Sequence, residues 1–385
     1  MAYYFIFPEK DTTIYSHPDR KTMNSGHDEI LELVKERGNS DPHHHPSRIL
    51  IKFLNDDITD TISNVIGHSN FNHPSSKSYL ELNTSEHRNL TTTLNIEGFA
   101  VSQSWNEGTG RYSNLPSSSN GASWTYRDND INKLVWPTSS FSPGTSGSLP
   151  ASSVLSQGGG NWYTGSGFYA SQQFLVGADL DINLDVTEII KKQSASLFAN
   201  QTYPTGIINN GFIIKQPQSI EIDTSSSFGE MKYFSVDTHT IYPPRLAFKW
   251  DDSIHSHQSS AKNSGELNVS LYRNKSKFNQ NSIATFRVHV RDKYPNRIFS
   301  TESNYLQAGY FTTSSYYSIR DAHTEEEVIP FDNDFTKMSA DNESMYFKIY
   351  MNGLQPERYY RLLFKHENND GITIYDENYH FKVVR

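Results

Sequence analysis

The chain has 385 residues, of which 35% are hydrophobic and 13% aromatic, and it carries a formal net charge of −9 and no cysteine. This length suffices for two or three domains with cores of their own. The lack of cysteine excludes disulfide frameworks, cysteine–zinc sites and thiol nucleophiles. The sequence has no block of lysine and arginine that would follow nucleic-acid phosphates, so we expect no nucleic-acid partner.

The opening segment, MAYYFIFPEKD (1–11), bears on targeting. It has no basic region before its apolar run, and that run stops at Pro8, so it is not typical of a signal peptide. No apolar stretch approaches the ~20 residues of a membrane span. We therefore expect synthesis in the cytoplasm and no membrane insertion.

Segments typical of β-strands dominate the first 250 residues. Aromatic and β-branched side chains recur in a background of Asn, Ser and Thr, which favours strands with one buried and one solvated face. The expected strands are 2–7, 12–16, 48–53, 78–83, 92–101, 210–215, 233–238 and 244–250. Two segments, 58–66 and 185–193, are the helix candidates, and Asp185 or Thr187 would cap the second.

The histidine-rich segment DPHHHPS (41–47) invites a metal hypothesis. Its three consecutive histidines are His43, His44 and His45. Imidazoles bind zinc well, but three neighbours in sequence rarely converge on one ion unless copies of the chain meet at a symmetry axis. The alternative is a solvated turn held by Pro42 and Pro46. We expect no metal and no cofactor, and the symmetry-axis site stays open.

Residues 106–161 differ from the strand-rich segments around them. They contain turn-forming runs such as SSSNGAS and QGGGN, yet they also hold large aromatic residues, which solvated linkers rarely carry. We expect one long ordered loop region that is packed on a sandwich by Trp105, Trp124, Trp136 and Trp162. The candidate glycan-binding residues are Trp124, Trp136 and Trp162, because tryptophan faces stack on sugar rings. If these three are buried, the loops are structural, and if two of them line an open groove, glycan binding is favoured.

Glu107 lies within this region, two residues after a tryptophan, and could be catalytic or structural. A glycosidase needs a second carboxylate within about 5–10 Å, and the nearest in sequence, Asp128 and Asp130, belong to another loop. The glycines that follow Glu107 favour a tight turn, in which its carboxylate would accept backbone N–H groups or pair with Arg111. We therefore expect a structural role and no enzyme activity.

From residue 265 a second β pattern begins, after a polar and patternless stretch at 251–264 that looks like a linker. Alternation is clean in 284–291, where Phe286, Val288 and Val290 face one way and the polar residues between them the other. Turn signals recur between the strand-like runs. The pattern is typical of a small antiparallel sandwich of about 100 residues.

Several short motifs follow one another through residues 11–250. They are DTTIYS (11–16), NSGHDEILEL (24–33), SRILIKF (47–53), SWNEGT (104–109), GASW (121–124), LDVTEII (184–190), NNGFIIK (209–215), KYFSVDT (232–238) and PPRLAF (243–248). Their order resembles the DNRLRE family of β-sandwich modules. The resemblance implies a jelly-roll-like sandwich in which the Trp-x-Glu-Gly-Thr segment is structural and no catalytic pair exists. The long insert and the DPHHHPS segment depart from the family.

The segment LQPERYY (354–360) carries a Leu-x-Pro-x-x-x-Tyr pattern. This pattern is similar to that of immunoglobulin and fibronectin type III domains. The resemblance implies a tyrosine corner, in which the hydroxyl of Tyr360 bonds to nearby backbone while Leu362 and Phe364 follow it inward. We thus predict an all-β chain: a jelly-roll-like β-sandwich over 1–250 with the loop insert 106–161, a linker at 251–264, and an immunoglobulin-like β-sandwich over 265–385.

A cysteine-free chain of two β-sandwiches rich in Asn, Ser, Thr and Tyr resembles structural proteins of tailed phages, including marine phages such as cyanophages. This implies a non-enzymatic virion component of the tail, baseplate, neck or capsid exterior, acting in assembly or host attachment. Its partners would be other virion proteins, with the chain as a homo-oligomer or in multiple copies. The alternative is a carbohydrate-binding adhesin module that recognises a host surface glycan. A third hypothesis is a glycan hydrolase that uses Glu107.

Overall fold

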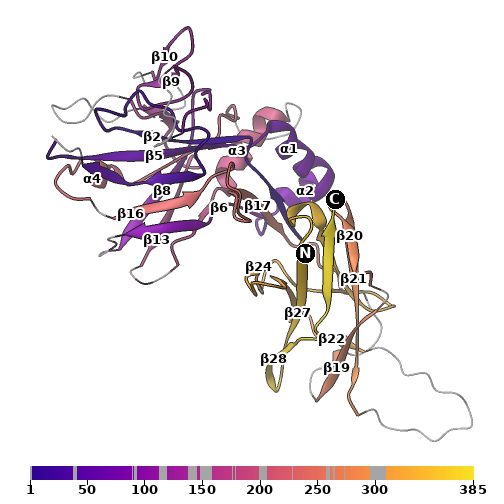
Figure 1. Ribbon diagram of the computed structural model, residues 1–385. Helices are drawn as coiled ribbons and strands as arrows, with labels where there is room; N and C mark the ends of the chain where they lie inside the picture. The colour runs from indigo at the N-terminus through magenta and orange to yellow at the C-terminus, as the bar shows by residue number, and fades with distance from the viewer. Residues whose placement is uncertain are drawn as a thin grey trace, which may run out of the picture. The chain divides into compact units, whose positions relative to one another are not determined.

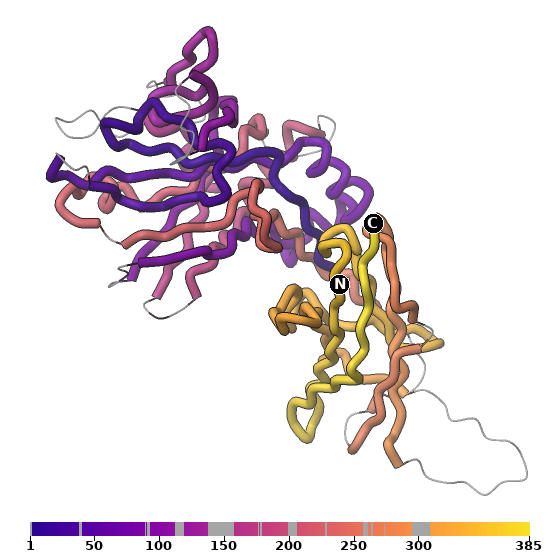
Figure 2. The backbone as a smooth tube through the Cα atoms, viewed as in Figure 1, coloured from indigo at the N-terminus to yellow at the C-terminus, as the bar shows by residue number. Residues whose placement is uncertain are grey.

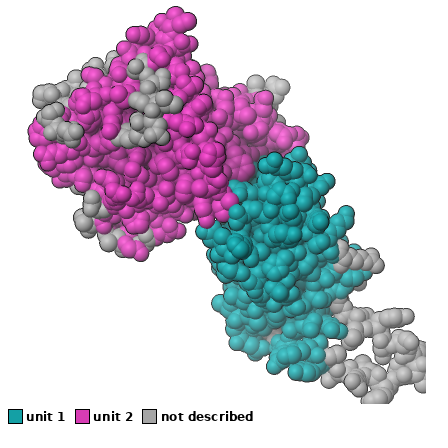
Figure 3. Space-filling view, in the orientation of Figure 1, with its two compact units in different colours: residues 1–5, 66–76, 248–385 teal, residues 6–65, 77–247 magenta. Residues whose placement is uncertain are grey.

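The chain divides into two compact units that are not continuous in sequence (Figure 3). We call residues 6–65 and 77–247 the N-terminal unit, and residues 1–5, 66–76 and 248–385 the C-terminal unit. The computed structural model describes residues 2–37, 41–88, 90, 93–111, 119–137, 145–147, 158–175, 177, 179–198, 206–227, 229–256, 261–262, 265–272, 274–294 and 309–385. Both chain ends belong to the C-terminal unit (Figure 2).

Strands are the main regular structure of both units (Figure 1). Up to residue 250 they are β1 (Ala2–Ile6), β2 (Lys10–Tyr15), β3 (Ile30–Leu33), β4 (Lys35–Arg37), β5 (His44–Lys52), β6 (Lys77–Leu82), β7 (Thr84–Arg88), β8 (Leu94–Ala100), β9 (Tyr126–Asp128), β10 (Leu134–Val135), β11 (Thr145–Gly147), β12 (Asn161–Tyr163), β13 (Tyr169–Phe174), β14 (Ile182–Asp185), β15 (Phe212–Lys215), β16 (Glu230–Phe234) and β17 (Arg245–Trp250). All the strands expected in this part of the sequence are found, with ends shifted by a few residues.

The strands after residue 250 belong to the C-terminal unit. They are β18 (Ala261–Lys262), β19 (Leu267–Tyr272), β20 (Lys277–Asn279), β21 (Ile283–Asp292), β22 (Tyr310–Phe311), β23 (Ser315–Asp321), β24 (Glu327–Ile329), β25 (Ser339–Ala340), β26 (Met345–Tyr350), β27 (Tyr359–Asn368), β28 (Gly371–Tyr375) and β29 (His380–Val384), with a short 3-10 turn at Met351–Gly353. The sheets are mostly antiparallel, and the all-β prediction is confirmed.

The sheets of the N-terminal unit form a sandwich-like core. One sheet of this unit has the order β13-β8-β15-β5-β2, with β4 added beside β5, and another has the order β3-β16-β7. Strand β14 pairs with β6. Strand β6 alternates buried and half-buried residues, so Leu80 and Leu82 enter the core. The sheets of β8 and β14 lie face to face, since a Cβ on Gly98 would stand 3.0 Å from Leu184.

Helices are few and short. The helix predicted over 58–66 is found as α1 (Asn55–Asp60) continued by a π-helical turn (Thr61–Ile66), and the second as α3 (Thr187–Leu197); α2 (His68–Phe71) and α4 (Gln218–Glu221) are single turns. The N-cap position of α3 is Val186, but the Asp185 carboxylate accepts the Thr187 N–H at 3.1 Å. No described helix is long and apolar enough to cross a membrane.

The C-terminal unit is a sandwich with an aromatic core. One sheet has the order β19-β21-β26-β25, and the other β20-β29-β27-β23-β24 with β28 beside β27. Phe347 of the first sheet stacks on Tyr317 of the second at 4.3 Å between ring centroids, and Phe286 lies 5.3 Å from Phe381. The alternation predicted for 284–291 is confirmed.

The tyrosine corner is present in the C-terminal unit. The Tyr360 hydroxyl donates to the Gln355 carbonyl at 3.0 Å, and the ring is buried. Leu362 and Phe364 follow it into the core, as predicted. This geometry agrees with the immunoglobulin-like expectation for the segment.

The expected linker at 251–264 differs from the observed arrangement in its described part. Ala340 donates its N–H to Ile254 at 2.9 Å, and Ser256 donates to Ala340 at 2.8 Å, so this stretch is bound to β25. Residues 1–5 also join the C-terminal unit, where Phe5 packs on Gly353. The units are therefore built from segments distant in sequence. Independent folding of residues 1–250 and of residues 265–385 remains a prediction.

Candidate functional site

The four tryptophans of the loop region form one buried cluster in the N-terminal unit. Their exposed fractions are 4% for Trp105, 0% for Trp124, 3% for Trp136 and 6% for Trp162. They pack with aliphatic residues of β2, β5 and β15, among others. The indole N–H of Trp105 donates to the Asn210 carbonyl at 2.9 Å, and that of Trp136 donates to a loop carbonyl at the same distance. Each of these two polar groups is thus satisfied without water.

A buried cation lies within this cluster. The Arg48 guanidinium lies 4.6 Å from the ring centroid of Trp124 and 5.0 Å from that of Trp162. It donates to both carboxylate oxygens of Glu221, each at 2.8 Å, and both side chains are fully buried. Lys215 extends the network, with its ammonium 3.2 Å from Glu97 and 3.4 Å from Glu221. Two cations and two carboxylates therefore balance one another beneath the indoles.

The three glycines at 158–160 approach this network closely because they lack side chains. Gly159 has a φ of +80°, and a Cβ there would stand 2.6 Å from Arg48 and 2.7 Å from Trp124. Its N–H donates to the Trp124 carbonyl at 2.7 Å, and its own carbonyl accepts from Arg48. Only glycine permits both this backbone conformation and this close approach.

The candidate glycan-binding residues are therefore covered in this structure. Trp124, Trp136 and Trp162 present no open face, and a sugar ring needs an accessible face to stack on. Their burial favours the structural interpretation of the loops. A glycan site on this chain would have to use other aromatic residues.

Glu107 is positioned by backbone contacts across the N-terminal unit. Its Oε1 accepts the N–H of Asp11, at the start of β2, at 3.1 Å. The next residue, Gly108, has a φ of +81° and touches Asn24, whose side-chain amide donates to the Glu107 carbonyl at 2.5 Å. Burial raises the pKa of Glu107, and the Asp11 N–H opposes that rise. The expected backbone acceptor role is confirmed.

Asp11 interacts with Glu107, and the sequence did not indicate this second carboxyl group. Asp11 is fully buried, and its Oδ2 accepts the Val236 N–H at 2.7 Å. Its Oδ1 has no hydrogen-bond partner among the described residues. Burial raises the pKa of Asp11 well above its usual range; the Val236 N–H opposes this, and the charges of Glu107 and Asp237 add to it. A sugar cannot reach a fully buried carboxyl, so this pair suits a structural role better than glycosidic cleavage.

The histidine-rich segment is not a solvated turn. His44 and His45 begin β5, and His45 is buried with its Nε2 2.8 Å from the Asp41 carboxylate. Burial lowers the pKa of His45, against the opposing effect of Asp41. The ring lies edge-on to His17, with 5.3 Å between centroids. The turn expectation was wrong because β4 pairs with β5 and draws the segment into the sheet.

The described residues contain no group of three or more histidines, aspartates or glutamates that could hold a metal ion. His43 and His44 are half-buried, and the His44 ring lies 3.3 Å from the Thr224 carbonyl. A metal site shared between copies of the chain through His43, His44 and His45 stays a hypothesis.

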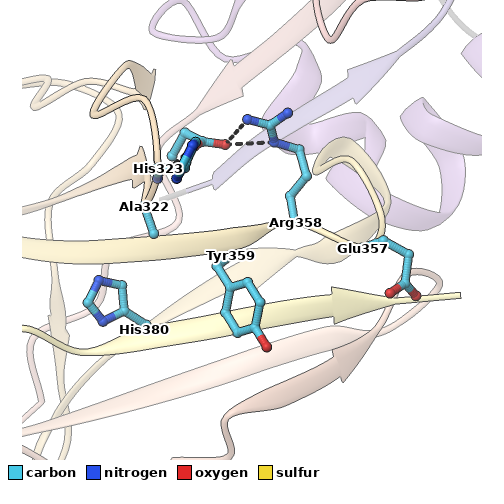
Figure 4. A pocket seen from close by; sticks show the side chains of 7 residues that line it. Ala322, His323, Glu357, Arg358, Tyr359 and His380 are labelled. Carbon is cyan, nitrogen blue, oxygen red and sulfur yellow. Dashed lines mark hydrogen bonds and ion pairs between the residues drawn. The ribbon is translucent and has the colours of Figure 1, made fainter.

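An open pocket of about 660 Å³ lies in the C-terminal unit (Figure 4). It is lined by Asp321, Ala322, His323, Glu357, Arg358, Tyr359 and His380. These residues come from the end of β23, the start of β27 and the start of β29. The sequence did not indicate this pocket, because its walls come from three separate segments. The Leu-x-Pro-x-x-x-Tyr motif (354–360) contains three of the lining residues, Glu357, Arg358 and Tyr359, but it gave no sign of a pocket.

Ion pairs hold the pocket walls. Arg358 donates to the Asp321 carboxylate at 2.7 and 2.6 Å, and Asp321 also accepts the His323 N–H at 2.9 Å. These bonds hold the pKa of Asp321 below its usual range despite burial, which opposes them. Glu357 pairs with Lys382 at 2.5 Å, and this contact lowers the pKa of Glu357. All of these charged groups have a partner of opposite sign.

Comparison with known proteins adds no assignment. No protein-family model matches the chain, and no curated protein matches it. The described structure defines the chain as an all-β protein with antiparallel sheets, of the β-sandwich type.

Proposed function

We propose that this chain is a non-enzymatic structural component of a tailed-phage virion, located in the tail, baseplate, neck or capsid exterior. It acts in assembly or attachment through contacts with other virion proteins or with further copies of itself. The support from sequence is the cysteine-free, Asn-, Ser-, Thr- and Tyr-rich style of two β-sandwiches. The observation that carries the proposal is an exposed aliphatic hairpin on a rigid base.

The hairpin of β9 and β10 projects apolar side chains into solvent. The exposed fraction is 93% for Ile131 and 57% for Val135, and Leu134 between them is also exposed. Scattered apolar residues on a surface are ordinary, but three within five positions at a hairpin are typical of an interaction surface. A neighbouring virion protein is the occupant that fits best, because it would bury these side chains permanently.

The base of the hairpin is fixed by the tryptophan cluster. The Ser123 N–H donates to the Tyr126 carbonyl at 2.8 Å, and the Asn129 N–H donates to Gly121 at 3.0 Å. Trp136, directly after β10, is buried and bonded to Ser123. A surface held in this way loses little conformational freedom on docking, which favours tight assembly.

The direct test is whether the protein is located on phage particles. An antibody raised against the recombinant chain is applied to density-gradient-purified phage particles and to the soluble fraction of the same lysate. The proposal predicts immunogold labelling at one fixed position on intact particles. Signal confined to the soluble fraction contradicts it.

A matched pair of variants tests the hairpin itself. Ile131→Asp should lower incorporation into particles, because a charge cannot be buried in an apolar contact without a partner. Ile208→Asp is the control, since Ile208 is also an exposed aliphatic residue of the N-terminal unit, at 68% exposure. Equal incorporation of both variants would remove the hairpin from the assembly surface.

A further inference from the structure

We propose that the pocket of the C-terminal unit binds a neutral saccharide, with the ring of Tyr359 as its stacking platform. This inference goes beyond the structural role and does not depend on it. The pocket volume of about 660 Å³ lies within the range of small-ligand sites, ~300–1,000 Å³. The pocket combines one exposed aromatic ring with several polar groups, which is the chemistry that sugar rings need.

The exposure of Tyr359 is set by strand alternation. Tyr360 points inward and forms the tyrosine corner, so Tyr359 points outward and is 55% exposed. Across the ladder it lies opposite Lys382, whose ammonium is 5.6 Å from the ring centroid. The C–H face of a sugar can therefore pack on the exposed part of the ring while the lysine side chain supports it.

The polar groups of the pocket match the hydroxyls of a sugar. Arg358 offers N–H donors, and Glu357 offers carboxylate acceptors. His323 and His380 each offer ring nitrogens that donate or accept according to the tautomer. In Figure 4 the Tyr359 ring lies between His380 and Glu357, whereas Arg358 and His323 point away from the ring toward each other. A polyol with adjacent hydroxyls can use donors and acceptors at once, whereas an apolar ligand can use neither.

The charge balance selects a neutral ligand. Arg358 is paired with Asp321 at 2.6 Å, and Lys382 is paired with Glu357 at 2.5 Å. The next arginine on β27, Arg361, is bonded to Glu325 at 2.7 Å and to Asp376. An anionic ligand would have to displace these carboxylates from the arginines and the lysine. A cationic ligand would have to displace the arginines and the lysine from the carboxylates. Uncharged hydroxyls need no such exchange.

The pocket walls are fixed before any ligand arrives. Glu357 has a φ of +65°, a left-handed conformation that costs energy for a residue with a side chain. Its N–H donates to the Val383 carbonyl at 2.7 Å, and the Ala322 N–H donates to the Tyr359 carbonyl at 2.9 Å. These bonds hold the three contributing segments together, which lowers the cost of ordering on binding.

The test measures binding of the full chain to maltotriose, cellotriose and chitotriose, with trigalacturonic acid as the charged comparison, by titration calorimetry and ligand-observed NMR. At least one neutral trisaccharide should bind. Tyr359→Ala should weaken this binding by about tenfold or more, which corresponds to ~1.4 kcal/mol. Tyr359→Phe should stay within about twofold, because the ring is kept.

The matched control is Tyr294→Ala. Tyr294 is 75% exposed and lies beneath the ammonium of Lys293 at 5.5 Å, but it does not line the pocket. This variant should bind like the native chain. If Tyr359→Ala fails to fold, Tyr359→Leu keeps the apolar bulk without the aromatic face and should show the same loss. Absence of binding by all neutral trisaccharides, native binding by Tyr359→Leu, or tighter binding of the acidic trisaccharide would each overturn the proposal.

Discussion

Arg48 donates to both carboxylate oxygens of Glu221, Nε to Oε1 and Nη2 to Oε2, each at 2.8 Å, and neither side chain is exposed. The two residues come from β5 and α4, far apart in the sequence. The pair also holds the tryptophan cluster, because the guanidinium lies against Trp124 and Trp162. It therefore fixes the loop region to the sheet beneath it.

We expect Arg48→Met to destabilise the N-terminal unit strongly. The substitution keeps much of the volume but leaves the buried Glu221 without its bidentate partner, which typically costs about 3–5 kcal/mol. Lys215 remains 3.4 Å from Glu221 and keeps the loss toward the lower end of that range. Urea unfolding followed by tryptophan fluorescence measures the change, because four of the five tryptophans lie in the same cluster.

Two variants control this prediction. The double replacement of Arg48 by Met and Glu221 by Leu should recover most of the loss, since no buried charge is left unpaired. Lys191→Met, which breaks the exposed pair with Glu188, should change stability by no more than about 0.5 kcal/mol. A loss below ~1 kcal/mol for Arg48→Met would show that the pair does not hold the cluster.

Asp11→Asn should stabilise the chain above about pH 4, and its advantage should grow with pH. Burial raises the pKa of Asp11 well above its usual range, so the folded state holds a proton that the unfolded state releases from about pH 4 upward. Stability from this group is therefore present below the unfolded pKa and is lost as the pH rises through the folded pKa. Asparagine keeps the acceptor for Val236 and cannot ionise. Its gain in stability should therefore be larger at pH 7 than at pH 4.

The measurement is the urea midpoint of the native chain and of the variant between pH 4 and pH 8. Asp130→Asn serves as the control for the loss of one aspartate charge, because Asp130 is exposed. A difference between Asp11→Asn and the native chain that stays constant over this range would contradict the raised pKa.

Tyr360→Phe should destabilise the C-terminal unit by about 1–2 kcal/mol, the cost of orphaning a buried hydrogen-bond partner. Only the hydroxyl that donates to Gln355 is removed, and the ring packing remains. Tyr294→Phe removes the hydroxyl of an exposed tyrosine and should have no effect. An equal response of the two variants in thermal unfolding would argue against the tyrosine corner as a stabilising contact.

Glu107→Gln should leave any binding or assembly activity intact, and neither form should release sugar from host polysaccharide. Glutamine keeps an oxygen to accept the Asp11 N–H, so the loss of stability should not exceed about 1–3 kcal/mol. The test is reducing-sugar release from host cell-surface polysaccharide by both proteins. Cleavage by the native chain that disappears in the variant would make Glu107 catalytic and the chain an enzyme.

The strands could be predicted because their signal is local. Alternation in 284–291 and the β-branched run in 48–53 each fix a strand without reference to the rest of the chain. The tyrosine corner was also predictable, since Tyr360 and its acceptor Gln355 lie within one short motif. The packing of the tryptophans followed from the cost of exposing large aromatic residues in loops.

The contacts that define the sites could not be predicted in this way. Asp11 meets Glu107 across β2 and a distant loop, and no periodicity links two residues so far apart. The charge on Arg48 gave no sign that it would be buried, because arginine is usually exposed. His45 was misjudged for a related reason: polar neighbours suggested a turn, but strand pairing with β4 decided its burial.

The first strand also carries a consequence for how the protein is made. β1 leaves the ribosome long before its sheet neighbour β17, which begins only at residue 245. At ~5–20 residues per second, translation takes on the order of tens of seconds to reach it. Until then Tyr3 and Phe5 cannot be buried in their unit, and the nascent chain offers an apolar strand edge to any other nascent chain nearby. Recombinant yield should therefore depend on elongation speed and chaperone supply more than on the stability of the finished protein.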